Sequence, residues 1–282
     1  MASDIDVWLD ETFSEGELSP GQRRVADVVQ RNLRLAAYGD LAEVSERAGV
    51  NPSTAVRTAQ TLGFSGWKDF QRELRARHLA GLSTEETLQE HGVPGSPLHE
   101  AIARDVESLR QTLEANTAES AESTIRTLSE ARAILAVGLG SFAGPASVFA
   151  HLGSTMGYRI ALETRAGVHL ATAFNGIGGG DVVFLVNLWR TQRHILAAAE
   201  AGRRAGARIV VLTDRKRGPL AAAADHVVVV PSEGISFFQS VTAAGSAVYG
   251  LLAGMEAAHP DRSRAALRRT HELWKDLDVY AD

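Results

Sequence analysis

The chain has 282 residues, 45% hydrophobic and 22% charged, a balance typical of a folded globular protein and not of a disordered chain. This length allows one large domain or two ordinary ones. No apolar run approaches the roughly 18 residues of a membrane span, and residues 1–10 carry acids where a signal peptide would be basic and then apolar. Because cysteine is absent, disulfides and thiolate metal sites are excluded. We expect a cytoplasmic protein.

The formal net charge of −5 hides an uneven distribution along the chain. Residues 19–80 hold 10 Lys and Arg against 6 Asp and Glu, whereas residues 81–130 hold 3 Arg against 10 acids. A basic segment before an acidic one fits a DNA-binding module joined to a second domain. A solvated helical face would give the same charge pattern, so charge alone does not separate the two interpretations.

Two helices are predicted at the start of the basic segment. The first spans residues 19–36, where Ser19 can cap the N-terminus and apolar residues recur at helical spacing. A second, shorter helix opens at Asp40, whose carboxylate is expected to form a capping box with Glu43. Gly49 supplies the left-handed residue that ends this second helix.

A third helix follows at once, from the expected cap Asn51 to Gly63. The short, glycine-containing connection at residues 49–51 is typical of a helix-turn-helix. The outward face of the third helix is predicted to carry side chains that hydrogen-bond to base edges and phosphates, namely Ser53, Thr54, Arg57, Thr58, Gln60 and Thr61. A fourth helix near residues 64–74 would back the other three, and Lys68 and the fourth-helix arginines would hold the DNA backbone.

A second region begins after residue 80. Residues 81–96 have the composition of a linker, and helices are predicted over residues 97–116 and 118–131. Apolar runs then read as five buried strands, at residues 133–137, 158–162, 182–186, 207–212 and 226–230. Continuous apolar strands with helices between them indicate a parallel sheet covered on both faces. Residues 234–240 are expected to start a late helix.

Two stretches resemble a known family. Residues 50–57 (Val-Asn-Pro-Ser-Thr-Ala-Val-Arg) and 62–70 (Leu-Gly-Phe-Ser-Gly-Trp-Lys-Asp-Phe) resemble the DNA-binding domain of MurR/RpiR regulators, and the remainder resembles a SIS (sugar isomerase) domain. The resemblance implies an all-α helix-turn-helix domain at 1–80, a linker at 81–96 and an α/β SIS domain at 97–282, with a five-stranded parallel sheet flanked by helices. It also implies a dimer or tetramer that binds operator DNA and regulates carbohydrate or related catabolism.

Candidate ligand residues follow the strands, because in a parallel α/β sheet the ligand crevice lies beyond the carboxyl ends of the strands. Glycines after the first strand let main-chain amides approach an anion at a helix N-terminus, although a simple tight turn would look the same. The third strand ends before Asn187 and the fourth in Thr213. The predicted ligand-binding residues are Gly138, Gly140, Ser141, Asn187, Arg190, Thr191, Arg193, Thr213 and Asp214.

The loop after the third strand departs from the family pattern. Family members that bind phosphosugars usually carry a Ser-x-Ser-Gly loop there, but this chain has Asn187, Trp189 and Arg190 at the three defined positions. Phe142 likewise stands where the first motif commonly has a serine. Two interpretations stay open. In one, Arg190 and Arg193 bind an anion through charge-assisted hydrogen bonds; in the other, Trp189 fills the pocket and both arginines pair with surface acids.

The sequence therefore predicts a DNA-binding transcription regulator, not an enzyme, whose SIS domain binds a small anionic, carbohydrate-derived effector that modulates operator binding. The alternative is a SIS-domain sugar-phosphate isomerase, for which Glu163, Glu233 or His169 could serve as acid or base. The basic N-terminal segment and the altered phosphate loop count against it. No cofactor is expected, and scattered histidines without i, i+4 pairing predict no metal site.

Overall fold

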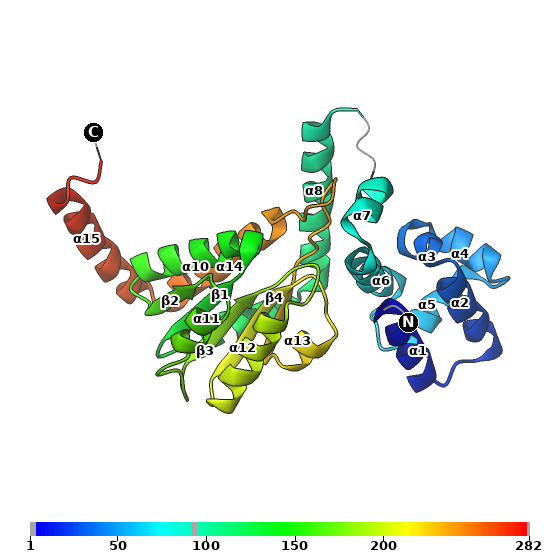
Figure 1. The fold of residues 1–282 in the computed structure, drawn as a ribbon, viewed down its shortest axis with the longest axis horizontal. Coiled ribbons are helices and arrows are strands. Elements are labelled where there is room, and N and C mark those ends of the chain that lie inside the picture. The colour runs from blue at the N-terminus through cyan, green and yellow to red at the C-terminus, as the bar shows by residue number, and fades with distance from the viewer. Residues whose placement is uncertain (1–3, 92–94, 281–282) are drawn as a thin grey trace. The chain divides into compact units, whose positions relative to one another are not determined.

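A computed structural model describes residues 4–91 and 95–280 and divides into two compact units (Figure 1). Unit 1 holds Met1–Pro97 with Ile235–Phe238, and unit 2 holds Leu98–Gly234 with Gln239–Asp282. The segment 81–96, expected as a linker, contains a helix at Thr84–His91, and its residues 92–94 lie outside the described residues, as do residues 1–3 and 281–282 of the predicted domains.

The described part of unit 1 is all helical. Its elements are α1 (Asp4–Glu15), α2 (Pro20–Arg31), α3 (Leu33–Tyr38), α4 (Leu41–Arg47), α5 (Pro52–Thr61), α6 (Trp67–Gly81) and α7 (Thr84–His91). They enclose a core in which Val25, Val44 and Leu74 are completely buried. Phe64, which precedes α6, packs edge-on against Phe70 with ring centroids 5.2 Å apart. The expectation of a fourth helix backing the first three is confirmed.

The first predicted helix, 19–36, is two helices, because the backbone leaves the helical conformation at Asn32 (φ −135°, ψ 58°). Side chains of α6 then bind the end of α3: Gln71 donates to the carbonyl of Gly39 at 2.8 Å, and Arg75 donates to that of Ala37 at 3.0 Å. These bonds satisfy carbonyls that a helix end leaves without partners. The packing of α6 therefore favours a separate, redirected α3 over a continuous helix.

The predicted helix caps have mixed outcomes. Ser19 caps α2 as expected and forms a capping box with Gln22. The capping box predicted between Asp40 and Glu43 is wrong: Asp40 stands at the N-cap of α4, but its side chain makes no capping hydrogen bond. Asn51 likewise occupies the N-cap of α5 by backbone position alone.

Unit 2 is a five-stranded parallel sheet between helical layers. Its strands are β1 (Ile134–Gly138), β2 (Ile160–Glu163), β3 (Val182–Val186), β4 (Arg208–Thr213) and β5 (His226–Val229), in the order β2-β1-β3-β4-β5. Its helices are α8 (Pro97–Ala115), α9 (Ala118–Ser129), the 3₁₀ turn η1 (Gly140–Phe142), α10 (Ala143–Thr155), α11 (Val168–Ala173), α12 (Arg193–Arg204), α13 (Pro219–Ala222), α14 (Thr242–Ala258) and α15 (Pro260–Asp276). All five predicted strands are confirmed within two residues at either end.

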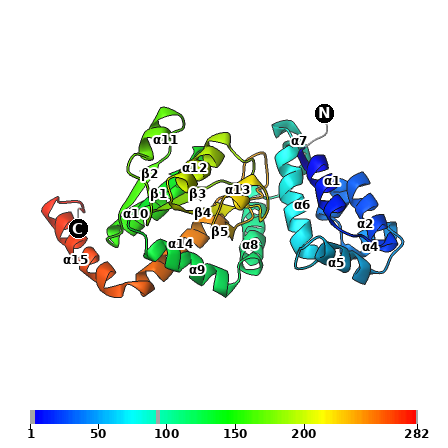
Figure 2. The same cartoon turned by 90° about the horizontal axis from the view of Figure 1, so that it is seen from below.

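The sheet is covered on both faces, as the apolar strands predict. Along β1, Ile134 points into a core formed with α9, α10 and α14, and Leu135 points into a second core formed with α11, α12 and α13. Figure 2 shows α9 and α14 on one side of the sheet and α11 and α12 on the other. The predicted start of a late helix at 234–240 is wrong, because α14 begins only at Thr242.

The strand order fixes where a ligand can lie. The chain runs from β1 to β2 on one side and then returns to β3 on the other side of β1. The loops after β1 and β3 therefore diverge at the carboxyl edge of the sheet, which is where open α/β sheets bind ligands. Throughout residues 4–91 and 95–280, no helix is both long enough and apolar enough to cross a lipid bilayer.

Candidate DNA-binding face and ligand edge

The turn between α4 and α5 has the geometry of a helix-turn-helix connection. Gly49 adopts φ +60°, a conformation that glycine takes without a steric penalty. The amide of Val50 then donates to the carbonyl of Ser45 at 3.0 Å. From α2, the Nε of Arg24 donates to the carbonyl of Ala48 at 3.1 Å, so a side chain of a third helix also holds the turn.

Helix α5 has one buried and one exposed face. Ala55 and Ala59 are completely buried against the other helices. Ser53, Arg57 and Gln60 are exposed, and their spacing of four and three residues places them along one side of the helix. Within the part of the chain that the structure describes, the Arg57 guanidinium makes no hydrogen bond or ion pair. This side of α5 is therefore available to a partner.

Other residues predicted to bind DNA are placed differently. Thr58 is 2% exposed and donates its hydroxyl to the carbonyl of Thr54 at 2.8 Å, so the structure does not place it on the outward face. Thr54 is half-buried and lines a polar groove of about 460 Å³ with Gly21 and other residues of the turn. Thr61 is exposed and accepts a hydrogen bond from Gln22 at 2.8 Å.

The basic side chains of α6 fall into two groups, one exposed to solvent and one engaged within unit 1. Lys68 is exposed at the start of the helix. The fourth-helix arginines, expected to hold the DNA backbone, are engaged within unit 1: Arg72 pairs with Asp69, Arg75 lies over the ring of Tyr38, and Arg77 pairs with Glu73. The side chains of Arg77 and Glu73 are 6% and 3% exposed. These arginines hold α6 against its own neighbours, and their expected contact with the DNA backbone stays a prediction.

At the carboxyl edge of β3, Asn187 shapes the loop that follows. Its side chain is 1% exposed; Oδ1 accepts from the amide of Gln192 at 3.0 Å, and Nδ2 donates to the carbonyl of Arg190 at 3.2 Å. These two bonds close the loop on itself. Inside it, Trp189 has φ +64°, which is an outlier conformation for a bulky residue. The positive φ therefore falls on Trp189, not on Arg190.

Asp214 connects this loop to its neighbours. One carboxylate oxygen accepts from the amide of Trp189 at 2.7 Å and from the hydroxyl of Ser232 at 2.8 Å. The loops after β3, β4 and β5 therefore meet at one buried carboxylate, which is 5% exposed. Thr213 beside it is also buried. Asn187, Thr213 and Asp214, predicted as ligand contacts, thus lie inside the loop structure.

The glycines after β1 have separate roles. A Cβ on Gly138 would collide with the carbonyl oxygen of Phe142, so this glycine permits the chain to fold back onto the strand. Gly140 has φ +61° with open space around it, and Ser141 next to it is exposed. Gly138 therefore provides the close approach of a tight turn, and Gly140 provides the open backbone.

The exposed part of this edge is basic. Arg190 and Arg193 are exposed and Thr191 is half-buried, and the guanidinium of Arg190 lies 4.7 Å from the centroid of the Trp189 ring. Sequence reasoning missed two features here. A run of three basic residues, 215–217, follows β4, and its charge alone could have drawn attention. Ser232 gave no such signal, because only the fold brings it to Asp214.

The side chains considered as acid or base are dispersed. The carboxylate of Glu163 accepts both side-chain bonds from Arg165, at 3.0 and 3.1 Å, and these hydrogen bonds hold the pKa of Glu163 below its usual value. Glu233 pairs with Arg104 at 3.1 Å, and His169 is exposed on α11. Among the described residues, no three His, Cys, Asp or Glu side chains gather as a metal site would require.

A helix-turn-helix with an exposed polar helix, joined in one chain to an α/β domain with a loop-lined edge, defines the class of two-domain DNA-binding regulators. The sequence model of the helix-turn-helix domain of the rpiR family matches residues 13–80, and that of the SIS domain matches residues 127–253. Together they account for more than half of the chain. The protein belongs to the RpiR family of transcription regulators with a SIS domain.

Solved structures show the same fold. The sugar isomerase domain of an RpiR transcription factor from Sphaerobacter thermophilus is 28% identical, with a TM-score of 0.60 over 62% of this chain and 97% of that one. The NanR protein of Vibrio vulnificus, complexed with ManNAc-6P, is 18% identical, with a TM-score of 0.63 over 99% of this chain and 100% of that one. The c3406 protein of E. coli CFT073 is 17% identical, with a TM-score of 0.51 over 67% of this chain and 100% of that one.

Proposed function

We propose that the protein binds double-stranded operator DNA through the exposed face of α5. The observation that carries this proposal is the outward row of Ser53, Arg57 and Gln60, in which the Arg57 guanidinium makes no hydrogen bond or ion pair among the described residues. Arginine is the commonest reader of guanine in the major groove. Thr61 extends the row, and Thr54 and Lys68 flank it at phosphate positions. Thr58 is buried and hydrogen-bonds to Thr54 within α5, so it is not part of the proposed DNA contact.

The test is a gel shift with the DNA that flanks the protein's own gene. Arg57→Ala should weaken specific binding by about 1–3 kcal/mol, since one base-reading side chain is lost. Arg159→Ala, an exposed arginine of unit 2 outside the helix-turn-helix, is the matched control and should leave binding unchanged. Full operator affinity in Arg57→Ala would overturn the placement of the reading helix.

The SIS domain is proposed to bind a small anionic, carbohydrate-derived effector at the carboxyl edge of the sheet. Arg193, in the first turn of α12, and Arg190 supply the positive charge, and Thr191 and Ser141 supply hydroxyls. The amides around Gly140 face the same edge. Gly138, Asn187, Thr213 and Asp214 act indirectly by shaping the loops. A sugar phosphate is the ligand named for the similar NanR structure, which supports this chemical class.

The SIS domain serves here as a sensor and not as an enzyme. Arg165 keeps Glu163 ionised, and Glu233 pairs with Arg104, so both carboxylates considered as acid or base already have cationic partners. Effector binding changes operator affinity only if it favours one arrangement of the protein over another. We place this regulator in the cytoplasm, as a homodimer or tetramer whose two heads occupy successive major grooves.

A thermal-shift panel of sugar phosphates and sugar acids tests the effector site. At least one anion should raise the melting temperature of the natural protein, and Arg193→Ala should abolish that shift while Arg159→Ala retains it. The same anion should change the gel shift. If no anion stabilises the protein, the effector proposal fails, and the DNA-binding proposal is tested separately by Arg57→Ala.

A further inference from the structure

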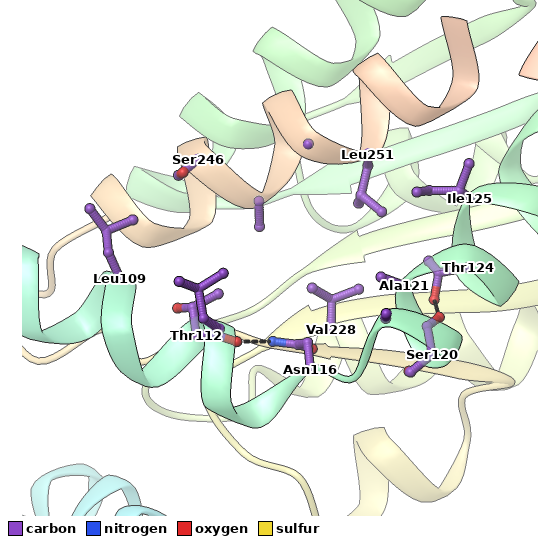
Figure 3. Close-up of a pocket in the computed structure, with 14 residues that line it drawn as sticks. Leu109, Thr112, Asn116, Ser120, Ala121, Thr124, Ile125, Val228, Ser246 and Leu251 are labelled. Carbon is purple, nitrogen blue, oxygen red and sulfur yellow. Dashed lines mark hydrogen bonds between the residues drawn. The ribbon is translucent and has the colours of Figure 1, made fainter. Parts of the chain in front are cut away.

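An apolar groove runs between three helices of unit 2. It has a volume of about 680 Å³ and lies between α8, α9 and α14 over β5 (Figure 3). Its walls are Leu109 and Leu113 of α8, Ala121 and Ile125 of α9, and Ala247 and Leu251 of α14. Leu113 is 81% exposed at the rim. Surfaces of this kind mark binding sites for other apolar surfaces.

Of the polar side chains in the groove, Thr112, Asn116 and Thr124 hydrogen-bond within the unit, and the hydroxyls of Ser120 and Ser246 complete its polar lining. Asn116 donates to the carbonyls of Thr112 and Val229, at 2.7 Å each, and accepts from the amide of Val229 at 2.9 Å. The hydroxyl of Thr124 donates to the carbonyl of Ser120 at 2.9 Å. Figure 3 shows the bonds from Asn116 to Thr112 and from Thr124 to Ser120. The groove therefore suits apolar side chains and offers little to a sugar or a charged metabolite.

Helix α15 is a polar helix with an apolar stripe that the described residues of its own unit cover only in part. Figures 1 and 2 both show it extending away from the sheet, at the end opposite α8. Ala266, in its first half, is buried on the body. The same side of the helix continues seven and eleven residues later with Leu273 and Leu277, which are 56% and 72% exposed. The apolar stripe is therefore buried at Ala266 and exposed to solvent at Leu273 and Leu277.

The charges of the two surfaces are complementary. Helix α15 carries four Arg and one Lys against three acids, whereas α8 and α9 together carry six acids against three Arg. Helix α15 is therefore net basic, and two helices of the groove are net acidic. Electrostatic complementarity of this kind fixes partner and orientation more than it adds affinity.

We propose that the second half of α15 and the residue that follows it, Leu277, dock from one copy of the chain in the α8–α9–α14 groove of a second copy, with Leu273 and Leu277 as the apolar contacts. The groove and the helix lie at opposite ends of one unit, so the partner for each is supplied by another molecule. A reciprocal arrangement doubles every contact in a two-fold dimer, which helps to reach the 1,200–2,000 Å² typical of a stable interface. Because α8 is the first helix of unit 2, this contact would involve the element that follows the DNA-binding unit in the chain.

Cysteine cross-linking tests the contact directly, since the natural chain contains no cysteine. Two chains of different tag size, one with Leu113→Cys and one with Leu277→Cys, are co-expressed and mildly oxidised. We expect the mixed disulfide-linked dimer in at least tenfold excess over a control pair, Leu113→Cys with Glu200→Cys, whose second position is exposed on α12.

Two results would overturn the proposal. One is a Leu113→Cys/Leu277→Cys chain that forms its disulfide within a single molecule. The other is a protein that self-associates while the mixed pair cross-links no more than the control pair. Neither result bears on the DNA or effector proposals, which have their own readouts.

A charge-insertion pair gives a second measurement. Leu273→Glu/Leu277→Glu should weaken self-association by at least tenfold in analytical ultracentrifugation, since two carboxylates would enter an apolar groove between helices that carry net negative charge. Val168→Glu, an apolar residue 77% exposed on α11, is the matched control and should leave self-association unchanged. Because Ala266 and the packed first half of α15 are untouched, an unchanged thermal unfolding curve will show that the chain still folds.

Discussion

The sequence predicts which polar side chains are exposed better on α5 than at the carboxyl edge of the sheet. On α5, most of the polar residues expected to face outward do so, with Arg57 free of contacts within the described chain. At the sheet edge, Asn187 and Asp214 were expected to bind a ligand, and both are buried: Asn187 hydrogen-bonds within its own loop and Asp214 to the neighbouring loops. Both groups of residues are polar, but the α5 residues are mostly exposed, whereas Asn187 and Asp214 are buried.

The difference follows from backbone regularity. In a helix, 3.6 residues per turn relate sequence spacing to side-chain direction, so the buried residues Ala55 and Ala59 indicate which residues face solvent. A loop has no such period. There the direction of a side chain depends on individual torsions, such as φ +64° at Trp189, that composition does not specify.

The strongest test of this comparison is Asp214→Ala. It removes a buried acceptor shared by the amide of Trp189 and the hydroxyl of Ser232, and each donor left without a partner destabilises the fold. We expect a loss of about 3 kcal/mol in the free energy of unfolding, measured by denaturant titration, together with loss of effector binding. A stable variant that merely binds effector more weakly would make Asp214 a direct contact.

Asn187→Ala should have a somewhat smaller effect. The amide of Gln192 and the carbonyl of Arg190 lose their partners, at a cost of about 2 kcal/mol. Arg193→Ala, at an exposed position in the same region, should leave the free energy of unfolding within about 0.5 kcal/mol of the natural value. Equal destabilisation by both would remove the distinction between loop-shaping and ligand-facing residues.

Asp181, at the amino edge of the sheet, is a control position for the variants at the carboxyl edge. Hydrogen bonds from Arg132, at 2.6 and 2.9 Å, hold the pKa of Asp181 below its usual value. Because the folded-state pKa is lowered, this contribution to stability is complete above the unfolded-state pKa and disappears as pH falls through the folded-state pKa.

Asp181→Asn should therefore lower stability at neutral pH by about 1 kcal/mol, a small value because Arg132 is largely exposed. It should also flatten the acid limb of a plot of unfolding free energy against pH. Effector binding should not change, since Asp181 lies at the edge away from the ligand loops. A variant with reduced effector binding would show that the two edges are coupled.

The smallest effect is expected for Thr58→Val. The side chain is buried and its hydroxyl bonds only within α5 among the contacts described, so a residue of the same shape should cost about 0.5–1 kcal/mol of stability. Operator affinity in a gel shift should match that of the natural protein. Ser53→Ala, five residues earlier and on the exposed face of α5, should weaken operator affinity. A tenfold loss of affinity in Thr58→Val would contradict the assignment.

Much of the fold could be predicted from the sequence, because its signals are periodic. Strand β3 coincides with the predicted run 182–186, where all residues are apolar and flanked by polar ones. The errors fall where tertiary contacts override local preference. Asn32 interrupts a good helical pattern because Gln71 and Arg75, some forty residues later, bind the end of α3.

The site was less predictable for the same reason. Asp69, Glu73 and their arginine partners read as a charged helical surface, yet they lie inside unit 1. Their spacing of three and four residues is equally compatible with exposure and with burial. Only the packing of α6 against its neighbours determines whether these side chains are exposed or buried, and the sequence of α6 alone does not specify that packing.

The internal use of basic side chains in unit 1 has a consequence for how binding responds to ionic strength. Of the ten Lys and Arg in residues 19–80, those whose side chains have no described partner are Arg31, Arg47, Arg57 and Lys68. Each phosphate neutralised releases about 0.9 condensed counterion from a duplex. A plot of log affinity against log salt concentration should therefore have a slope of roughly −4 or shallower for each head, far gentler than a count of its cations would imply.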